Sequence, residues 1–244
     1  MHRHIFSICQ FAVMAVAGFS RASDNSAGYL KIEKNTRAGK IQHEVVPYTG
    51  REGDLVFYDD RNPAWTALFA YAGTGPPLHM GIVFKKADGA LAVLEAGPDD
   101  TTRVSLLHLD KRLQQFQQHF KGTITIRRCK KELMAEQSMA LSKFAQAQDG
   151  KRYAVGRLLL QGTSLRTRGP VRELVLGKTV LDRDSWICSE LSVAAGTVAK
   201  LFDPKVVHSN VAYPRDLVDN VRYDLSESWD DAAVWLPKWP SEKK

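Results

Sequence analysis

Three residues of this 244-residue chain have types and surroundings that suit thiol chemistry. Cys188 stands where a turn-like stretch passes into a helical pattern. The first turn of a helix offers unpaired backbone N–H groups and the positive end of the helix dipole, and both favour a thiolate over a thiol. His79 could take the thiol proton, and Glu95 could orient the imidazole and stabilise its charged form. Together these residues would form a nucleophile, a base and an orienting carboxylate.

His79 and Glu95 are expected on two neighbouring strands. The apolar runs at 79–85 and 91–96 are separated by Asp88-Gly89, a dipeptide typical of a tight hairpin turn. Side chains on adjacent antiparallel strands can face the same way, so the histidine and the glutamate can meet.

The remaining pattern predicts an α+β fold, an antiparallel sheet with flanking helices. Strands cluster in the middle of the chain and helical patterns lie on either side of them. Further strands are expected at 53–58, 103–109 and 122–128, helices at 131–148 and 188–202, and an amphipathic piece at 111–120. Residues 59–77 hold three prolines and two glycines and are expected to form a loop around a short apolar piece. Residues 153–160 suit either a short helix or a loop.

Other assignments for the reactive residues stay open from the sequence. A cysteine at a helix start can be structural, and in an exported protein Cys129 and Cys188 could form a disulfide. Cys129 ends a strand-like run and suits a buried small apolar residue. Three other side chains could orient the imidazole in place of Glu95: Asp99, Asp100 and His108.

Four nearby residues have structural explanations of their own. Glu190 lies in the first helical turn, where an acid favours the helix dipole. Asp54 suits a residue that fixes the turn before its strand. Tyr58 and Trp186 could line a cleft or pack in the core.

Four short motifs, taken in order, resemble the circularly permuted papain-like families related to NlpC/P60, most closely the YiiX/YaeF-like permuted amidases. They are Gly53-Asp54-Leu55-Val56-Phe57, His79-Met80-Gly81-Ile82-Val83, Leu94-Glu95-Ala96 and Cys188-Ser189-Glu190-Leu191. In unpermuted NlpC/P60 enzymes the cysteine helix precedes the other motifs, whereas here it follows them. The resemblance covers most of residues 50–220. It implies a permuted papain-like fold in which Cys188 is the nucleophile, His79 the base and Glu95 the third polar residue.

The residues and the resemblance together predict an exported cysteine hydrolase that cleaves an amide or ester bond through a thioester on Cys188. The expected substrate is a cell-wall peptide or a lipid-linked acyl group. An acyltransferase using the same site is one alternative, and a non-catalytic binding module of the same fold is another. No cofactor and no metal are expected, because the sequence has no HExxH, P-loop or Gly-rich dinucleotide pattern.

The start of the chain predicts export. Residues 1–22 have a short basic head, an uncharged apolar run and small residues that suit signal-peptide cleavage. An uncleaved N-terminal anchor is the alternative. The expected location is the periplasm, the cell envelope or the extracellular space. Behind the signal peptide we expect an N-terminal arm at 23–50, a catalytic domain at 51–225 and a C-terminal tail at 226–244.

Composition limits the remaining function classes. The chain is 44% hydrophobic and 25% charged, which suits one sizeable core. Its net charge is +7, but the basic residues are scattered and no aromatic-interleaved basic stripe is present, so nucleic acid is not an expected partner. Mild basicity would suit association with a membrane surface or with anionic envelope polymers.

Overall fold

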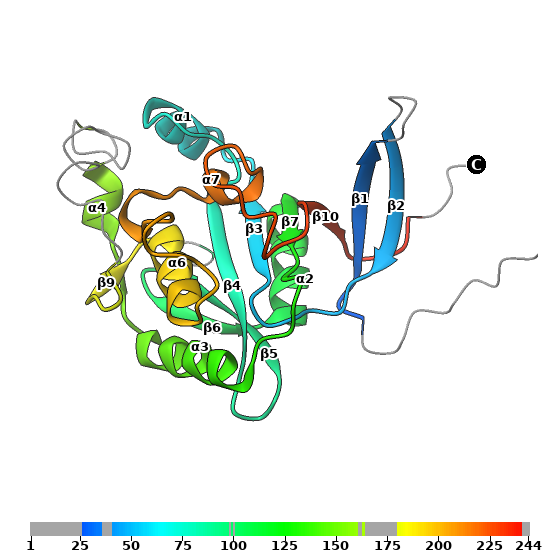
Figure 1. The fold of residues 1–244 in the computed structure, drawn as a ribbon. Helices are drawn as coiled ribbons and strands as arrows, with labels where there is room; N and C mark the ends of the chain where they lie inside the picture. Colours follow the sequence, from blue (N-terminus) through cyan, green and yellow to red (C-terminus); the bar gives the residue numbers. More distant parts are fainter. Residues whose placement is uncertain are drawn as a thin grey trace, which may run out of the picture.

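The protein is described by a computed structural model over residues 26–35, 41–97, 99, 101–160, 163 and 180–240. In this part of the chain an eight-stranded sheet, antiparallel throughout, forms the centre of the fold (Figure 1). The strand order is β2-β1-β10-β7-β3-β4-β5-β6. The α+β class and the antiparallel sheet with flanking helices are confirmed. The strands are β1 (Tyr29–Asn35), β2 (Ile41–Pro47), β3 (Leu55–Asp59), β4 (His79–Lys85), β5 (Leu91–Ala96), β6 (Val104–His108), β7 (Thr123–Arg127) and β10 (Ala233–Leu236).

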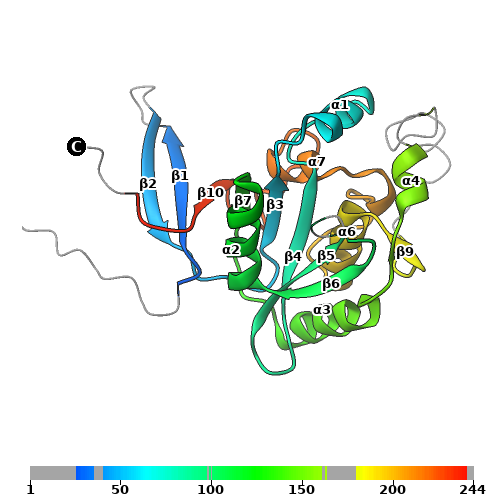
Figure 2. The same cartoon turned by 180° about the vertical axis from the view of Figure 1, so that it is seen from behind.

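Helices cover both faces of the sheet (Figures 1 and 2). Helices α3 (Ala135–Gln148) and α6 (Cys188–Val198) pack on one face, and α2 (Leu109–Phe120) packs on the other. Along β4, Met80 and Ile82 join the core beneath α3 and α6, whereas Val83 joins the core beneath α2. Because side chains alternate along a strand, His79 lies on the α2 side of the sheet.

The loop expected over 59–77 contains a helix, α1 (Pro63–Tyr71), so that part of the prediction is wrong. Asn62 caps the helix by accepting hydrogen bonds from two backbone N–H groups of its first turn. Pro63 occupies the first helical position, where its missing N–H costs nothing. The other two prolines of the segment lie beyond the end of α1, so the proline count gave a misleading signal.

Short elements surround the start of α6. Residues 153–160 divide between β8 (Arg152–Tyr153) and α4 (Val155–Leu159). Strand β8 pairs in parallel with β9 (Ser185–Trp186), which leads directly into α6. A 3-10 helix, η3 (Ser209–Val211), and a helix, α7 (Pro214–Val218), follow α6. Helix α6 ends at Val198, a few residues before the predicted end, and α3 begins four residues later than predicted.

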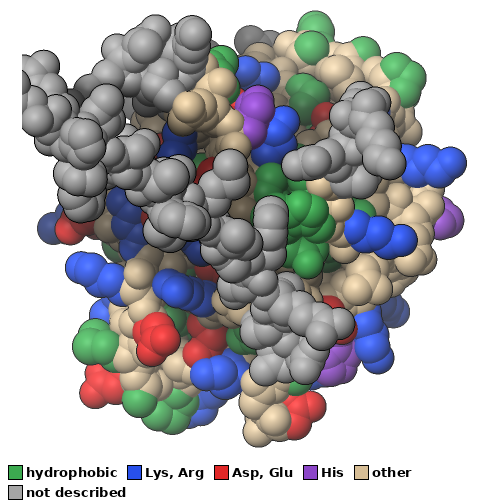
Figure 3. All heavy atoms as spheres, turned by 90° about the vertical axis from the view of Figure 1, so that its right-hand side faces the viewer, with side chains coloured by type: hydrophobic (Ala, Val, Ile, Leu, Met, Phe, Trp, Pro, Cys, Tyr) green, Lys and Arg blue, Asp and Glu red, His purple; other side chains and the backbone are tan. Residues whose placement is uncertain are grey.

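The segments expected to be an arm and a tail both contribute to the central sheet. Strands β1 and β2 pair with each other, and β10 joins them to β7. The side chains of β2 are mostly exposed or half-buried, so this strand lacks the apolar pattern of a core strand. Figure 3 views this end of the molecule, where Lys and Arg side chains are spread among Asp and Glu on the part of the face not drawn in grey.

The structure decides the predictions made for Asp54 and for the two cysteines. Asp54 accepts hydrogen bonds from the backbone N–H of Arg51 and of Cys129, which confirms that it fixes the turn before β3. Cys129 is buried in the core, and both Cys129 and Cys188 are free thiols, so the alternative of a disulfide between them is wrong.

Two predictions concern residues that the structure describes only in part or not at all. Residues 1–22 lie outside the described part, and export stays a prediction of the sequence. Among the described residues, no helix has the length and apolar character needed to cross a membrane. Most of 161–184, which the sequence left without a clear pattern, also lies outside the described part.

Candidate active site

Cys188 is the first residue of α6, as the sequence predicted, and its side chain is buried. Glu190 fixes this helix start, because its carboxylate accepts a hydrogen bond from the backbone N–H of Ile187 at 3.2 Å. The same carboxylate forms an ion pair with Arg157 of α4 at 2.7 Å. The structural explanation of Glu190 is therefore confirmed. The thiol is presented at the positive end of a well-anchored helix.

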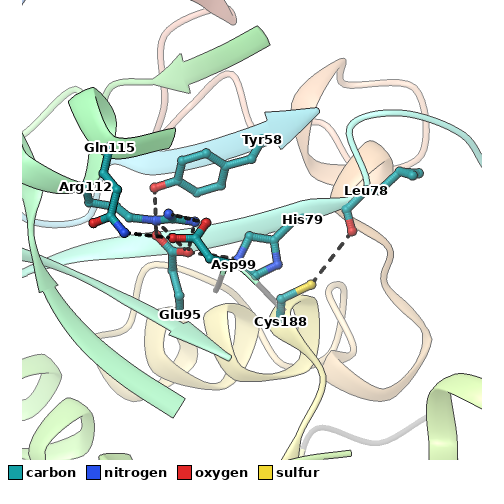
Figure 4. Close-up of polar contacts among 8 residues, drawn as sticks. All are labelled: Tyr58, Leu78, His79, Glu95, Asp99, Arg112, Gln115 and Cys188. Atoms are coloured by element: carbon teal, nitrogen blue, oxygen red, sulfur yellow. Dashed lines mark hydrogen bonds and ion pairs between the residues drawn. The ribbon is translucent and has the colours of Figure 1, made fainter. Parts of the chain in front are cut away.

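The imidazole of His79 lies between Cys188 and Glu95 (Figure 4). Its Nε2 is 2.9 Å from Glu95 Oε2, and its other side faces the thiol. The sulfur also lies 4.0 Å from the backbone oxygen of Leu78, the residue that precedes the histidine. The three residues that the sequence singled out come from β4, β5 and the start of α6, and the fold brings them together.

The surroundings of His79 favour the charged imidazolium. Burial lowers the pKa of His79, but the negative charge of Cys188 and the hydrogen bonds with Cys188 and Glu95 raise it by more, to about 10. The ordinary value is 6.5. A raised pKa means that His79 holds its proton as the imidazolium, the form that would stabilise a thiolate beside it.

Glu95 is fully buried on the sheet and is held ionised by its neighbours. The guanidinium of Arg112 donates to both carboxylate oxygens at 2.9–3.1 Å, and the hydroxyl of Tyr58 donates to Oε1 at 2.7 Å. Burial raises the pKa of Glu95, but Arg112 and His79 lower it by more, to about 2. A carboxylate that stays charged can stabilise the imidazolium beside it.

Neither Asp99 nor His108 replaces Glu95 beside the imidazole. Asp99 binds Arg112 at 2.7 Å and Gln115 at 3.1 Å. His108 pairs with Ala92 along β5, three residues from Glu95 on that strand, or roughly 10 Å away. The remaining alternative, Asp100, lies outside the described residues.

Arg112 and the role of Tyr58 were not predicted from the sequence. Arg112 is an almost fully buried arginine on the face of α2 that packs against the sheet. Its guanidinium lies 4.8 Å from the ring centre of Tyr58, in addition to its hydrogen bonds with Glu95 and Asp99. A signal was present, because Arg112 lies among the apolar residues of an amphipathic helix, where a charge needs a partner.

Trp186 is fully buried and bonds Gln148, so it packs in the core.

Gly81, two residues after His79, leaves room for the side chain of Glu95. It lies directly opposite Glu95 in the pairing of β4 with β5. A Cβ atom at Gly81 would lie 2.7 Å from Glu95 Cγ, 2.5 Å from Val93 Cγ1 and 2.9 Å from the backbone oxygen of Leu94. The empty space above Gly81 therefore lets the Glu95 side chain cross the neighbouring strand and reach His79.

Gly81→Ala is expected to displace Glu95 and to lower the rate of a reaction at Cys188 that depends on His79 by up to ~10²-fold, the cost of a misplacement of about 1 Å. Overpacking should also reduce the free energy of unfolding by ~1–3 kcal/mol. Steady-state rates and urea unfolding would measure both effects. Gly156→Ala is the matched control, since a Cβ there meets nothing within 4 Å. Unchanged activity in Gly81→Ala would contradict this role for the glycine.

A cavity of about 350 Å³ opens beside His79. The α1 and α4 helices form part of its wall, through residues such as Phe69 and Leu158. The same two residues also line a small hollow beside Cys188. The cavity and the thiol therefore meet at His79 and at this shared apolar wall.

Tyr153 is an aromatic residue of the cavity wall, and the strand that carries it pairs with the strand that leads into the cysteine helix. On β8 it pairs with Trp186, two residues before Cys188. Burial raises the pKa of Tyr153, and the charges of Cys188 and Glu190 raise it further, so the hydroxyl keeps its proton.

The described residues contain no group of three or more His, Cys, Asp or Glu side chains arranged to hold a metal ion.

A solved structure is distantly similar to this chain. No protein-family model and no curated protein matches the chain. A solved structure described as the metalloprotein yiiX from Escherichia coli O157:H7, DUF1105, aligns with a TM-score of 0.43 and 18% sequence identity. The alignment covers 77% of this chain and 90% of that chain. A similarity at this level assigns neither an activity nor a ligand to this chain.

Proposed function

We propose that this protein is a cysteine hydrolase with a permuted papain-like fold, which cleaves an amide or ester bond. The observation that carries the proposal is the alignment of Cys188, His79 and Glu95 (Figure 4). A thiol at a helix start, a charged imidazole beside it and a buried carboxylate on the far ring nitrogen are what nucleophilic catalysis by cysteine requires. The chain order, with the cysteine helix after the histidine and glutamate strands, supports the permuted arrangement.

The proposed reaction has two halves. The thiolate of Cys188 adds to the substrate carbonyl carbon, and the bond from that carbon to the leaving oxygen or nitrogen breaks as His79 gives the leaving group its proton. The products of this half are a Cys188 thioester and a free alcohol or amine. Water then adds to the thioester carbonyl, His79 takes a proton from that water, and the carbon–sulfur bond breaks to release a carboxylic acid and restore the ion pair.

Two groups near the thiol suit the negative charge that develops on the substrate oxygen. The backbone N–H of Cys188 lies in the first turn of α6 and has no acceptor within its own helix. The hydroxyl of Tyr153 stays protonated and can donate a hydrogen bond. Glu95 remains a carboxylate throughout and acts on the reaction by orienting His79.

The alkylation of Cys188 tests the ion pair without knowledge of the substrate. Only a thiolate reacts fast with iodoacetamide, and the imidazolium that stabilises it loses its proton only as the pH rises through about 10. Labelling of Cys188 is therefore expected to persist at about pH 6, well below the free-cysteine pKa of about 8.5. His79→Ala should slow labelling at that pH by tenfold or more, because about 2.5 pH units below a free-cysteine pKa only ~0.3% of the thiol is ionised.

Cys129 serves as an internal comparison in the same experiment. Burial raises the pKa of the Cys129 thiol, so this cysteine should label slowly at every pH below its titration. Mass spectrometry of peptides that contain each cysteine would give the two rates separately. Equal rates for the two cysteines, or no effect of His79→Ala, would overturn the proposed function.

A further inference from the structure

We infer that Arg157 of α4 is a positioning residue for the thiol: it holds the start of α6 in place and offsets the negative charge of Glu190, so that the thiolate of Cys188 is favoured. This inference rests on the proposed function and adds a residue to its machinery. Arg157 acts on the sulfur through Glu190 and through the backbone that precedes Cys188.

Glu190 has two opposing effects at the start of α6. Its carboxylate accepts a hydrogen bond from the backbone N–H of Ile187 at 3.2 Å, which fixes the first turn of the helix. Its charge, however, lies two residues from Cys188, and both side chains line the same small hollow. A negative charge beside a sulfur opposes the thiolate, because like charges repel. The carboxylate that fixes the helix therefore disfavours the nucleophile unless a positive group lies beside it.

Burial strengthens this opposition. Glu190 is 2% exposed and Cys188 is 3% exposed. Charges that lie away from water interact more strongly than charges at the surface, because solvent and salt screen them less. Burial is the largest cause of the raised pKa of Tyr153, and the charges of Cys188 and Glu190 add to it. The charge of this carboxylate therefore acts on the groups that surround the thiol.

Arg157 supplies the opposite charge and joins three elements at the thiol. Its Nη2 donates to Glu190 Oε2 at 2.7 Å and to the backbone oxygen of Ser185 at 2.7 Å. Its Nη1 lies 3.5 Å from the hydroxyl oxygen of Ser185. Ser185 belongs to β9, the strand that leads into α6. The guanidinium thus links α4 to the strand before the thiol and to the carboxylate after it, a task for which its several donors in one plane are suited.

Other elements also place ionisable groups around the thiol. On β4, His79 is an imidazolium that is bonded to a carboxylate of its own. On β8, Tyr153 keeps its proton and is uncharged. Tyr213 lines the hollow before α7, and its backbone N–H donates to Asp216 of that helix at 2.8 Å. Among these groups, Arg157 is the cation that bonds directly to the carboxylate in the first turn of α6.

The test follows the alkylation of Cys188 by iodoacetamide in the full chain from about pH 4 to about pH 9, at low and constant salt. Arg157→Met is expected to move the pH midpoint of labelling upward by about one unit, because Glu190 then opposes the thiolate with less compensation. Below the midpoint, labelling should slow by up to about tenfold. Glu190→Gln keeps an oxygen that can accept from Ile187 and removes the negative charge, so it should move the midpoint downward.

Three further variants separate the charge of Arg157 from its packing. Arg157→Met combined with Glu190→Gln removes both charges, and its midpoint should return close to the wild-type value. A loosened helix start would not give shifts of opposite sign that cancel in the double variant. Arg157→Lys retains the charge and should keep most of the wild-type midpoint. Arg152→Met is the matched control, because Arg152 is an exposed arginine of β8 that pairs with Ser185, and its loss should leave the midpoint unchanged.

The failure of this inference and the failure of the proposed function give different results. Wild-type Cys188 that does not label below neutral pH, or that labels independently of His79, rejects the proposed function and the inference with it. Low-pH labelling of the wild type with an unchanged midpoint in Arg157→Met overturns the inference alone, as does a shift that Glu190→Gln does not reverse. If Arg157→Met does not fold, a Glu190→Gln midpoint that stays at the wild-type value overturns it. Opposite shifts that cancel in the double variant support it.

Discussion

Cys188→Ala is expected to remove all covalent turnover of amide and ester substrates, a loss of roughly 10⁴-fold or more. The reason is that Cys188 is the nucleophilic side chain that faces His79 at the start of α6 (Figure 4). Steady-state rates on an activated ester, p-nitrophenyl acetate, would measure the loss, with circular dichroism as the check on folding. Undiminished turnover in Cys188→Ala would overturn the whole assignment.

The other two members of the site should give graded losses. His79→Ala should cost nearly as much as loss of the thiol, because the base and the proton donor for the leaving group are both removed. Glu95→Gln keeps the shape and one oxygen but loses the charge that stabilises the imidazolium. General acid–base help is typically worth ~10²–10⁴-fold, so an orienting residue should cost a part of that and leave measurable activity.

The matched control for the substitutions at Cys188, His79 and Glu95 is a change at the second cysteine. Cys129→Ala removes the other described thiol, which lies in the core and outside the site. It should leave the rate constant per folded molecule unchanged even if it lowers stability. Wild-type activity in Glu95→Gln would show that the charge of this carboxylate is not needed to orient His79.

Arg112→Met is expected to lower the free energy of unfolding by ~3–5 kcal/mol at pH 7, the usual cost of breaking a buried ion pair by removing one partner. The change leaves the carboxylate of Glu95 fully buried with much less positive charge near it. Methionine keeps most of the apolar contact with Tyr58 and Phe116, so the loss reports mainly the charge. Urea unfolding would measure it.

The pH dependence of this loss distinguishes a charge effect from a packing effect. In the wild type the pKa of Glu95 is lowered to about 2 from 4.5, so its contribution to stability is present above about 4.5 and is lost as the pH falls through 2. Without Arg112 the pKa of Glu95 rises, because burial is then less opposed. Protonation of Glu95 on lowering the pH from 7 to 4 should therefore reduce the deficit of Arg112→Met.

Two further variants test the same account of Arg112. Glu95→Gln combined with Arg112→Met removes the unpaired buried charge, and it should be more stable than Arg112→Met alone. Arg103→Met replaces an exposed arginine that bonds the backbone of Gly150, and a change of only about 0.5 kcal/mol is expected. A deficit in Arg112→Met that does not change with pH would show that the packing of the side chain matters and its charge does not.

The parts of the fold predicted correctly are those with strong local signals. The hairpin of β4 and β5 combines two apolar runs with an Asp-Gly turn, and α6 has a clear start. The strands β1 and β2 were not recognised, because exposed strands at one end of a sheet carry little apolar pattern. They hold their place through β10, which lies about 200 residues further along the chain. No local pattern reports a pairing over that distance.

Some residues of the candidate site were predicted from the sequence and others were not. Cys188, His79 and Glu95 were identified by residue type and by the elements expected around them. Arg112 was missed because its role depends on how α2 lies across β5, which is a property of packing and not of sequence. Gly81 was noted as part of a motif, but its purpose became clear only from the register that places it opposite Glu95.

The position of β10 within the sheet has a consequence for synthesis on the ribosome. This strand pairs with β1 on one side and with β7 on the other, although it is the last strand along the described chain. During translation β1 and β2 are made first, but they have no attachment to the rest of the sheet until residues 233–236 emerge. The earliest strands to be synthesised are thus the last to be incorporated, and the open edge of β7 stays unpaired until then.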